Sequence, residues 1–376
     1  MTTQPAQGPG PKRILALDGG GVRGIVTIAF LQRMEAVLRD ELRRPDLVLA
    51  DHFHLIGGTS VGSILATMLA LGWPMERVHQ TFTGWCREIF GSRIGLGLLW
   101  PKFHAGPLTQ RLDETLGDMR LGDPRLLTGL AIVTKRLDTG SPWWIVTNNP
   151  RSKYWDGADE RDRNRLLRVA DLVRASTAAP TVFNPQWLPL ARGHSEGLFV
   201  DGGLTPFNNP SLALLMLARI STLGYGWPLG PASLTMISIG TGSWRERRTG
   251  GYGRFTPAAL IGTDALADMI GTSQKLSLAL MQWLSKSRAP WEINSELGTL
   301  AGEVLGPGSN PGEPLLAFQR YDVALEADRL EPYLGWQPSL AHVAKMRRLD
   351  HPGQQETLYR IATRAAEEQV RSEDFV

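Results

Sequence analysis

Near the start of the chain, the same order of elements occurs twice: a short apolar run, a glycine-rich turn and a helical pattern. The first unit has its apolar run at residues 14–17 and helical spacing over 24–42, and the second has them at 53–57 and 61–71. Strands that alternate with helices in this way predict a parallel sheet with helices on its faces. The runs are apolar at almost every position, which is typical of strands buried on both faces.

The rest of the chain continues this alternation, so we expect a three-layer α/β/α fold with a mainly parallel central sheet. We predict a flexible N-terminal tail at residues 1–12 and a single α/β domain over 13–376, of which 243–376 is the less assignable part. The further strands are predicted at 130–136, 143–147, 198–200 and 234–239, and the further helices at 165–178, 210–219, 264–288 and 354–371.

Composition narrows the class of protein. The chain has 42% hydrophobic and 20% charged residues and a net charge of +3, which is typical of a folded globular protein and too small to indicate binding of a nucleic acid polymer. The single cysteine, Cys86, excludes an internal disulfide and any cysteine-based metal site, and it indicates a reducing, cytoplasmic location. The best apolar stretch, residues 61–71, is shorter than the roughly 20 residues that span a membrane.

Residues 19–24 form a glycine-rich loop between the first strand and the first helix. The loop satisfies the pattern GxGxxG, so a dinucleotide-binding or nucleotide-binding regulatory protein is one interpretation. Against it, Asp18 places a carboxylate where a pyrophosphate would arrive, and the second strand ends without an acidic residue to hold a ribose. The loop still offers backbone N–H groups at a helix N-terminus, where negative charge is favoured.

The pattern GxSxG occurs twice, around Ser60 and around Ser195. Ser60 lies between an apolar strand and an apolar helix, which is the context of a nucleophile elbow, whereas Ser195 precedes a strand in a polar turn. We therefore take Ser60 as the candidate nucleophile, with Gly58 and Gly62 as the glycines of its elbow.

A serine nucleophile needs a base. In the chain order of an α/β-hydrolase, His342 or His351 would fill that role, but both lie in a charged helical region near the C-terminus. The alternative is Asp201, which ends the strand predicted at 198–200 and precedes two glycines. Because the carboxyl ends of parallel strands share one edge, we expect Asp201, Ser60 and the glycine loop to meet there.

Taken together, these motifs resemble the patatin-like phospholipases, a family of lipid acyl hydrolases. The resemblance covers residues 13 to about 242. It is carried by Asp18-Gly19-Gly20-Gly21-Val22-Arg23-Gly24, Gly58-Thr59-Ser60-Val61-Gly62, Ala175-Ser176-Thr177-Ala178-Ala179-Pro180, Asp201-Gly202-Gly203 and Asn208-Asn209-Pro210, in that order.

The resemblance implies a metal-independent phospholipase A or broader lipid acyl hydrolase that uses a Ser–Asp dyad without histidine or cofactor. Ser60 would attack the ester carbonyl and Asp201 would accept its proton. The oxyanion hole would be the loop Gly19, Gly20, Gly21 and Arg23, in which Gly20 and Gly21 donate their N–H groups. An aspartate is a weak base near pKa 3.9, so Asp201 needs close geometry or partial desolvation.

Two further segments suggest partners. The apolar, glycine-rich stretch 89–103, with Leu98, Leu99, Trp100 and Lys102, suits a loop that meets a phospholipid membrane surface, or else a buried connector. The arginine-rich stretch 244–254 suits an anionic head group or a nucleotide, because some bacterial patatin-like effectors are gated by cyclic nucleotides, or else an exposed basic loop. A small-molecule activator is therefore a candidate partner.

Overall fold

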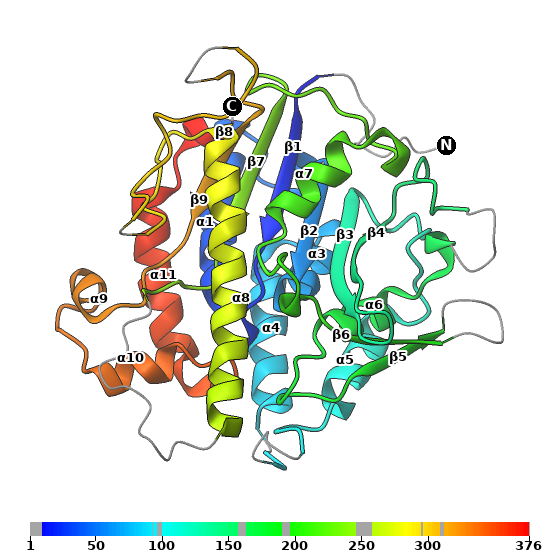
Figure 1. Cartoon of the computed structure of the whole chain (residues 1–376), viewed down its shortest axis with the longest axis vertical. Helices are drawn as coiled ribbons and strands as arrows, with labels where there is room; N and C mark the ends of the chain where they lie inside the picture. Colours follow the sequence, from blue (N-terminus) through cyan, green and yellow to red (C-terminus); the bar gives the residue numbers. More distant parts are fainter. Residues whose placement is uncertain are drawn as a thin grey trace.

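The computed structural model describes residues 10–91, 93–95, 100–156, 163–189, 196–245, 258–294, 296–308 and 312–375. Within these residues a nine-stranded sheet has the order β5-β6-β3-β2-β1-β7-β9-β8, and β4 pairs with β3 off this path (Figure 1). The strands are β1 (Lys12–Leu17), β2 (Leu55–Thr59), β3 (Gly129–Arg136), β4 (Pro142–Thr147), β5 (Gln186–Pro189), β6 (Glu196–Asp201), β7 (Leu234–Ile239), β8 (Ser285–Lys286) and β9 (Leu316–Tyr321).

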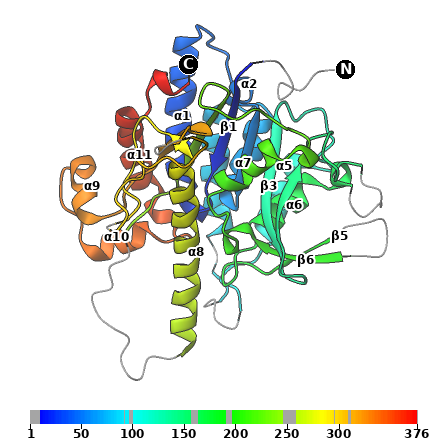
Figure 2. The same cartoon turned by 45° about the horizontal axis from the view of Figure 1, so that its top comes forward.

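Helices cover both faces of this sheet, so the predicted three-layer α/β/α fold is confirmed (Figures 1 and 2). They are α1 (Gly24–Glu41), α2 (Leu49–His52), α3 (Val61–Ala70), α4 (Met75–Ile89), α5 (Gly106–Leu116), α6 (Val169–Ser176), α7 (Ser211–Arg219), α8 (Ala258–Trp283), α9 (Ala327–Leu334), α10 (Leu340–Met346) and α11 (Gln355–Gln369). No helix in the described ranges combines the length and apolar character needed to cross a bilayer.

Strand β1 shows why a continuous apolar run is needed at the centre of the sheet. Successive side chains of a strand point to opposite faces. Leu15 and Leu17 join the core shared with α1, α3 and α4, whereas Ile14 and Ala16 join the core on the α7 side. All four side chains are fully buried. Both faces of β1 therefore lie in hydrophobic cores, as the apolar runs indicated.

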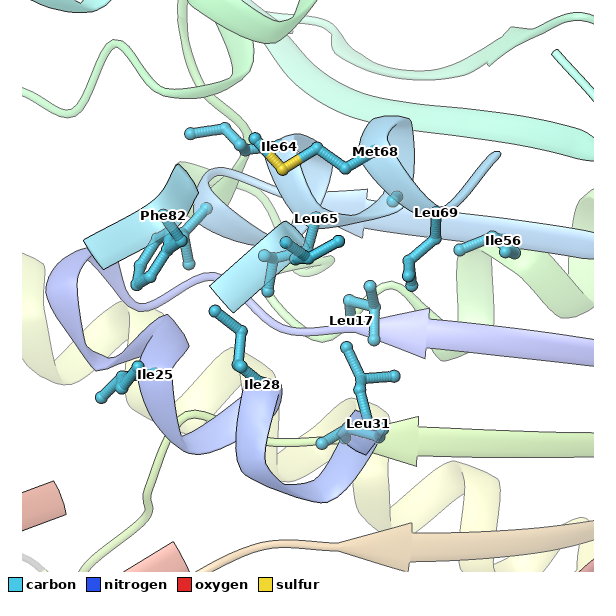
Figure 3. Packing of buried hydrophobic residues seen from close by; sticks show 14 of the residues in the cluster. Leu17, Ile25, Ile28, Leu31, Ile56, Ile64, Leu65, Met68, Leu69 and Phe82 are labelled. Atoms are coloured by element: carbon cyan, nitrogen blue, oxygen red, sulfur yellow. The ribbon is translucent and has the colours of Figure 1, made fainter. Parts of the chain in front are cut away.

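The larger core lies where α1 and α3 pack over the strands. Leu17 of β1 and Ile56 of β2 face these helices, and Ile28 of α1 and Leu65 of α3 meet above them (Figure 3). Each of these side chains is buried to at least nine-tenths, and burial of one such side chain is worth about 1.5–3 kcal/mol. This packing holds the start of α3, and with it the turn between β2 and α3.

Several boundaries and directions differ from the sequence prediction. Strands β4, β5 and β6 are antiparallel to their neighbours, while β1, β2, β3, β7, β8 and β9 run parallel. Helix α6 is shorter than the predicted 165–178, because residues 167 and 168 are extended and the apolar spacing continues across that break. Helix α8 begins at residue 258 rather than 264. Helix α4 and strand β9 were not predicted.

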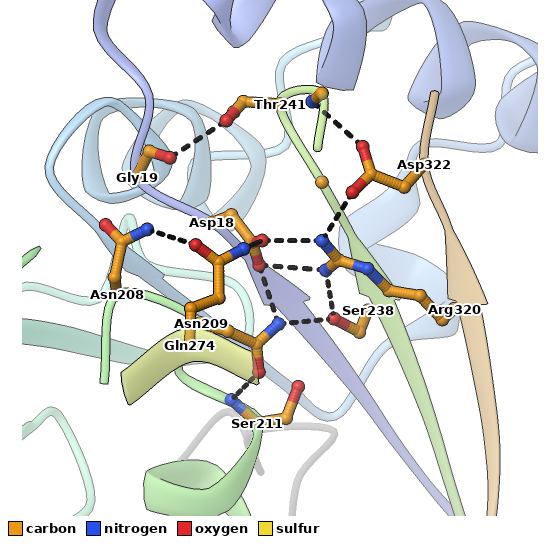
Figure 4. A network of polar contacts seen from close by, with 12 residues as sticks. Asp18, Gly19, Asn208, Asn209, Ser211, Ser238, Thr241, Gln274, Arg320 and Asp322 are labelled. Atoms are coloured by element: carbon orange, nitrogen blue, oxygen red, sulfur yellow. Dashed lines mark hydrogen bonds and ion pairs between the residues drawn. The ribbon is translucent and has the colours of Figure 1, made fainter. Parts of the chain in front are cut away.

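A buried ion pair joins two strands that are not neighbours. Asp18 directly follows β1 and has no exposed surface, and Arg320 of β9 donates to both of its carboxylate oxygens at 3.0 and 2.7 Å (Figure 4). Strand β7 lies between β1 and β9, and its Ser238 hydroxyl accepts another hydrogen bond from Arg320 at 2.8 Å. Burial lowers the pKa of the Arg320 guanidinium, but the carboxylates of Asp18 and Asp322 outweigh this effect and raise the pKa above its ordinary value.

Replacing Arg320 with methionine keeps most of its volume but leaves the Asp18 carboxylate buried without its cation. We expect Arg320→Met to lower the free energy of unfolding by about 3–5 kcal/mol, measured by urea denaturation. Arg125→Met is the matched control, because Arg125 is exposed and its partner Asp123 lies at the surface. The urea concentration at the midpoint of its unfolding should equal that of the wild type. Equal midpoints for the wild type and Arg320→Met would contradict the role assigned to the pair.

Candidate active site

Ser60 lies at a sharp turn between β2 and α3. Its backbone has φ 55° and ψ −125°, a positive-φ conformation that residues with a side chain rarely adopt. The turn is tight enough to exclude larger residues beside it: a Cβ on Gly58 would lie 2.0 Å from the Gly62 carbonyl oxygen, and one on Gly62 would lie 2.2 Å from that of Leu17. The strained, glycine-flanked serine has the geometry of a nucleophile elbow.

Neighbouring hydroxyl groups hold the backbone of this turn. The Ser60 N–H donates to Ser176 Oγ at 2.9 Å, and Ser176 Oγ donates in turn to the Val133 carbonyl at 2.6 Å. On the other side, the Ser60 carbonyl accepts a hydrogen bond from Ser63 Oγ at 2.6 Å. These partners satisfy the polar groups of the strained residue, so the side chain of Ser60 is left to point toward Asp201.

Ser60 and Asp201 are in direct contact. Ser60 Oγ donates to Asp201 Oδ2 at 2.6 Å, and the Gly203 N–H donates to the other carboxylate oxygen at 2.7 Å. The Asp201 N–H is bonded to the Ala178 carbonyl at 3.0 Å. The segment of residues 175–180 therefore binds the backbone of both residues, through Ser176 at one and through Ala178 at the other.

The route by which Asp201 reaches Ser60 differs from the predicted one. We expected parallel strands to deliver both residues to one edge, but β6 runs antiparallel to β3, with Asp201 opposite Thr134. Strand β3 extends past the end of β2, where Thr59 lies opposite Val133. Strand β6 therefore approaches from beyond the edge and ends beside the elbow. The expected strand direction was wrong, because direction depends on which strands pair, and that is not visible in a local pattern.

Asp201 is buried, with 5% of its surface exposed. This desolvation raises the pKa of its carboxyl to about 6, against the hydrogen bonds from Ser60 and Gly203 and the charge of Arg174, which act in the opposite direction. A carboxyl group with a pKa near 6 is partly protonated close to neutral pH. It can therefore both accept and return a proton under ordinary conditions.

The glycine loop lies against this pair. A Cβ on Gly19 would lie 3.3 Å from the Ser60 Cβ, and the Gly19 N–H donates to the Asn208 carbonyl at 3.1 Å. Within the described ranges, the N–H groups of Gly20 and Gly21 have no hydrogen-bond partner. Two backbone donors without partners, in a loop that touches the serine, are suited to bind a developing negative charge.

Arg23 follows the loop but is directed to its far side. Its guanidinium donates to the Gly242 carbonyl at 3.2 Å and lies 4.8 Å from the ring centroid of Trp244. Burial lowers the pKa of Arg23 to about 10, which leaves it charged at neutral pH. These contacts anchor the glycine loop to the segment that follows β7.

Sequence reasoning missed several residues around the site. Asn208 and Asn209 were interpreted as a helix N-cap, yet Asn209 Nδ2 donates to Asp18 at 2.7 Å and Asn208 Nδ2 donates to Gln274 of α8 at 2.8 Å (Figure 4). Gln274 also donates to Asp18 at 2.7 Å. A polar residue among the apolar positions of α8 was the only signal for Gln274, and it does not indicate which loop the side chain meets.

The two histidines considered as alternative bases are not part of this arrangement. In the described part of the chain, neither His342 nor His351 bonds to Ser60 or Asp201. The second GxSxG serine, Ser195, lies outside the described residues. So do residues 92 and 96–99 of the stretch 89–103, and residues 246–254 of the arginine-rich stretch 244–254.

Known proteins resemble this chain over the part that contains Ser60 and Asp201. The family model "Patatin-like phospholipase" matches residues 15–215. The chain is 31% identical to a "cGAMP-activated phospholipase" of Escherichia coli and 30% identical to one of Vibrio cholerae, in matches that cover 59% and 62% of this chain. It is 32% identical to "Patatin-like protein 1" of Arabidopsis thaliana over 62% of this chain. The matches span 65%, 70% and 59% of these relatives' lengths. The chain therefore belongs to the patatin-like phospholipase family.

Proposed function

We propose that this protein is a lipid acyl hydrolase of the phospholipase A type, which cleaves carboxylic esters of membrane phospholipids through Ser60 and Asp201. The observation that carries the proposal is the 2.6 Å hydrogen bond from Ser60 Oγ to Asp201 at a strained elbow. The neighbouring glycine loop, whose N–H groups at Gly20 and Gly21 have no partner among the described residues, supports it. Membership of the patatin-like phospholipase family supports the same substrate class.

The reaction would proceed in two steps. Ser60 Oγ attacks the ester carbonyl while its proton moves to Asp201 Oδ2, and the N–H groups of Gly20 and Gly21 stabilise the oxyanion. As the tetrahedral intermediate collapses, the proton passes from Asp201 to the departing alcohol oxygen, leaving an acyl-serine. A water molecule then loses a proton to Asp201 and attacks the acyl carbon. As the bond between the acyl carbon and Ser60 Oγ breaks, Asp201 returns this proton to Ser60 Oγ, and the fatty acid leaves.

Burial of Asp201 explains how a carboxylate could serve as the base without a histidine. An exposed aspartate near pKa 3.9 holds a proton too weakly to take one from serine efficiently. With a pKa of about 6, Asp201 is a stronger base and still mostly ionised at neutral pH. In this proposal Arg23 does not touch the substrate: it anchors the loop that presents the donors, through its contacts with Gly242 and Trp244.

A cyclic nucleotide is the activator that we propose for this enzyme. The support comes from the relatives named cGAMP-activated phospholipases. The arginine-rich stretch that we considered for an anionic ligand is mostly outside the described residues, and its described member Arg245 pairs with Glu292 at 2.6 Å on the surface. The activity assays below are therefore run both without and with a cyclic dinucleotide.

Loss of the two proposed catalytic residues is the first test. We expect Ser60→Ala and Asp201→Asn each to reduce hydrolysis of p-nitrophenyl butyrate and of phospholipid vesicles by at least about 10³-fold, with a chelator present throughout. Ser221→Ala, an exposed serine of the short helical turn that follows α7, is the matched control and should retain the wild-type activity. A fully active Ser60→Ala protein would exclude this mechanism. Binding of the nucleotide without any hydrolysis would favour a regulatory protein instead.

The pH dependence tests Asp201 as the base. Because only the ionised carboxylate can accept the serine proton, kcat/KM for the soluble ester should fall about tenfold per pH unit below pH 6. Arg174→Gln should move this midpoint upward, since the positive charge of Arg174 favours the ionised form of Asp201. Far-UV circular dichroism across the range separates titration from unfolding. A rate that stays constant down to pH 4.5 would exclude a base with a raised pKa.

We also propose that residues 89–103 contact the membrane surface. Trp100 is 76% exposed, whereas Phe103 is buried and Lys102 pairs with Asp350 at 2.9 Å, so the cation expected beside the indole is already engaged. Leu98 and Leu99 lie outside the described residues.

Trp100→Ser should therefore reduce binding to liposomes in a flotation assay, because it removes an indole that suits the depth of the lipid head groups. Hydrolysis of p-nitrophenyl butyrate should not change. Trp336→Ser, which removes another exposed indole, is the control for general surface effects. If Trp100→Ser binds liposomes as well as the wild type does, this loop is not the part of the protein that contacts the membrane.

A further inference from the structure

Helix α8 presents an apolar stripe on its outer surface. Ala265, Met269, Thr272 and Leu276 are all exposed, and the two large side chains are exposed by 66% for Met269 and 61% for Leu276. The helix lies at the front of the molecule in Figure 1, and Figure 2 shows its N-terminal half reaching beyond the sheet. Large apolar side chains on one face of an outer helix indicate an interaction surface.

The inner face of α8 packs against the rest of the protein, so the exposed stripe is not the face that attaches the helix. Ser277 Oγ donates to the Pro206 carbonyl at 2.7 Å, and Gln282 donates to the Trp291 carbonyl at 2.9 Å. Met281 is fully buried. The stripe lies on the opposite side of the helix from these contacts.

The spacing of the stripe indicates what covers it. Its four residues follow one another at intervals of four, three and four, which is the spacing of the seam between paired α-helices. The helix has 26 residues and a length of about 39 Å, enough for several layers of such a seam. The stripe alternates large residues, Met269 and Leu276, with small ones, Ala265 and Thr272, so a second helix could approach closely.

We propose that α8 pairs antiparallel with α8 of a second copy of this chain about a two-fold axis. In this register Met269 lies opposite Thr272 of the second copy and Leu276 lies opposite Ala265, so each large side chain meets a small one. The same register places Asp268 opposite Lys275 of the second copy, and the symmetry repeats this pair on the other side. The charges complement each other only when the two helices run in opposite directions.

This pairing would stabilise the helix that holds the proposed active site. Through Gln274, α8 donates to Asp18 at 2.7 Å and accepts from Asn208 at 2.8 Å, and these two residues adjoin the glycine loop. The pairing itself does not depend on the proposed enzymatic function.

The first experiment measures self-association by sedimentation velocity of the full chain up to about 100 μM. We expect a dimer for the wild type and a monomer for Met269→Glu/Leu276→Glu, because the double variant places four carboxylates in one apolar seam. Leu340→Glu is the control: this leucine of α10 is 76% exposed, and its substitution should leave the dimer intact. Circular dichroism confirms that each variant is folded. A wild type that stays monomeric at the highest concentration overturns the proposal.

The second experiment tests the register through the charged pair. Asp268→Lys and Lys275→Asp each place like charges opposite one another twice per dimer, and each should raise the dimer dissociation constant about three- to tenfold. The double exchange Asp268→Lys/Lys275→Asp restores the complementarity and should return the constant to near the wild-type value. If none of the three variants changes the dimer dissociation constant, the antiparallel register is wrong. Loss of liposome binding by Met269→Glu/Leu276→Glu, with a monomeric wild type, would show a lipid surface as the occupant instead.

Discussion

The charge of Asp18 is the constraint that the centre of this structure satisfies. A carboxylate without exposed surface is costly unless donors surround it, and here they come from three parts of the chain: Arg320 of β9, Asn209 before α7 and Gln274 of α8. Because Asp18 directly precedes the glycine loop, the same contacts fix where the loop leaves the sheet. In the mechanism that we propose, the N–H groups of this loop meet a developing charge, and a rigid origin would hold them in place.

The elbow depends on a second set of contacts, centred on residues 175–180. This segment binds the N–H group of Ser60 through the hydroxyl of Ser176 and the N–H group of Asp201 through the carbonyl of Ala178. One short stretch of chain therefore positions the backbone of both residues, which are far apart in the sequence. The strain at Ser60 persists because Ser63 and Ser176 satisfy the backbone groups that the turn would otherwise leave unpaired.

Burial links the geometry to the chemistry that we propose. The pKa of Asp201 rises to about 6 because its carboxyl is desolvated, and the hydrogen bonds from Ser60 and Gly203 limit that rise.

Helix α8 has two distinct surfaces: Gln274 on the inside holds Asp18 and Asn208, while the outer stripe with Met269 and Leu276 is exposed. Gln274 therefore links α8 to the two residues that adjoin the glycine loop.

The sequence by itself determined the local elements that carry the site. Apolar runs with glycine turns predicted β1, α1 and α3 within a few residues, and the context of Ser60 and of Asp201 selected the two side chains that the structure brings within 2.6 Å. The tertiary structure alone decided the antiparallel direction of β6, the partner of Asp18 and the role of Gln274. Periodicity records which residues are buried along one element, whereas strand pairing and buried ion pairs join residues such as Asp18 and Arg320 that are far apart in the chain. No local pattern contains that information.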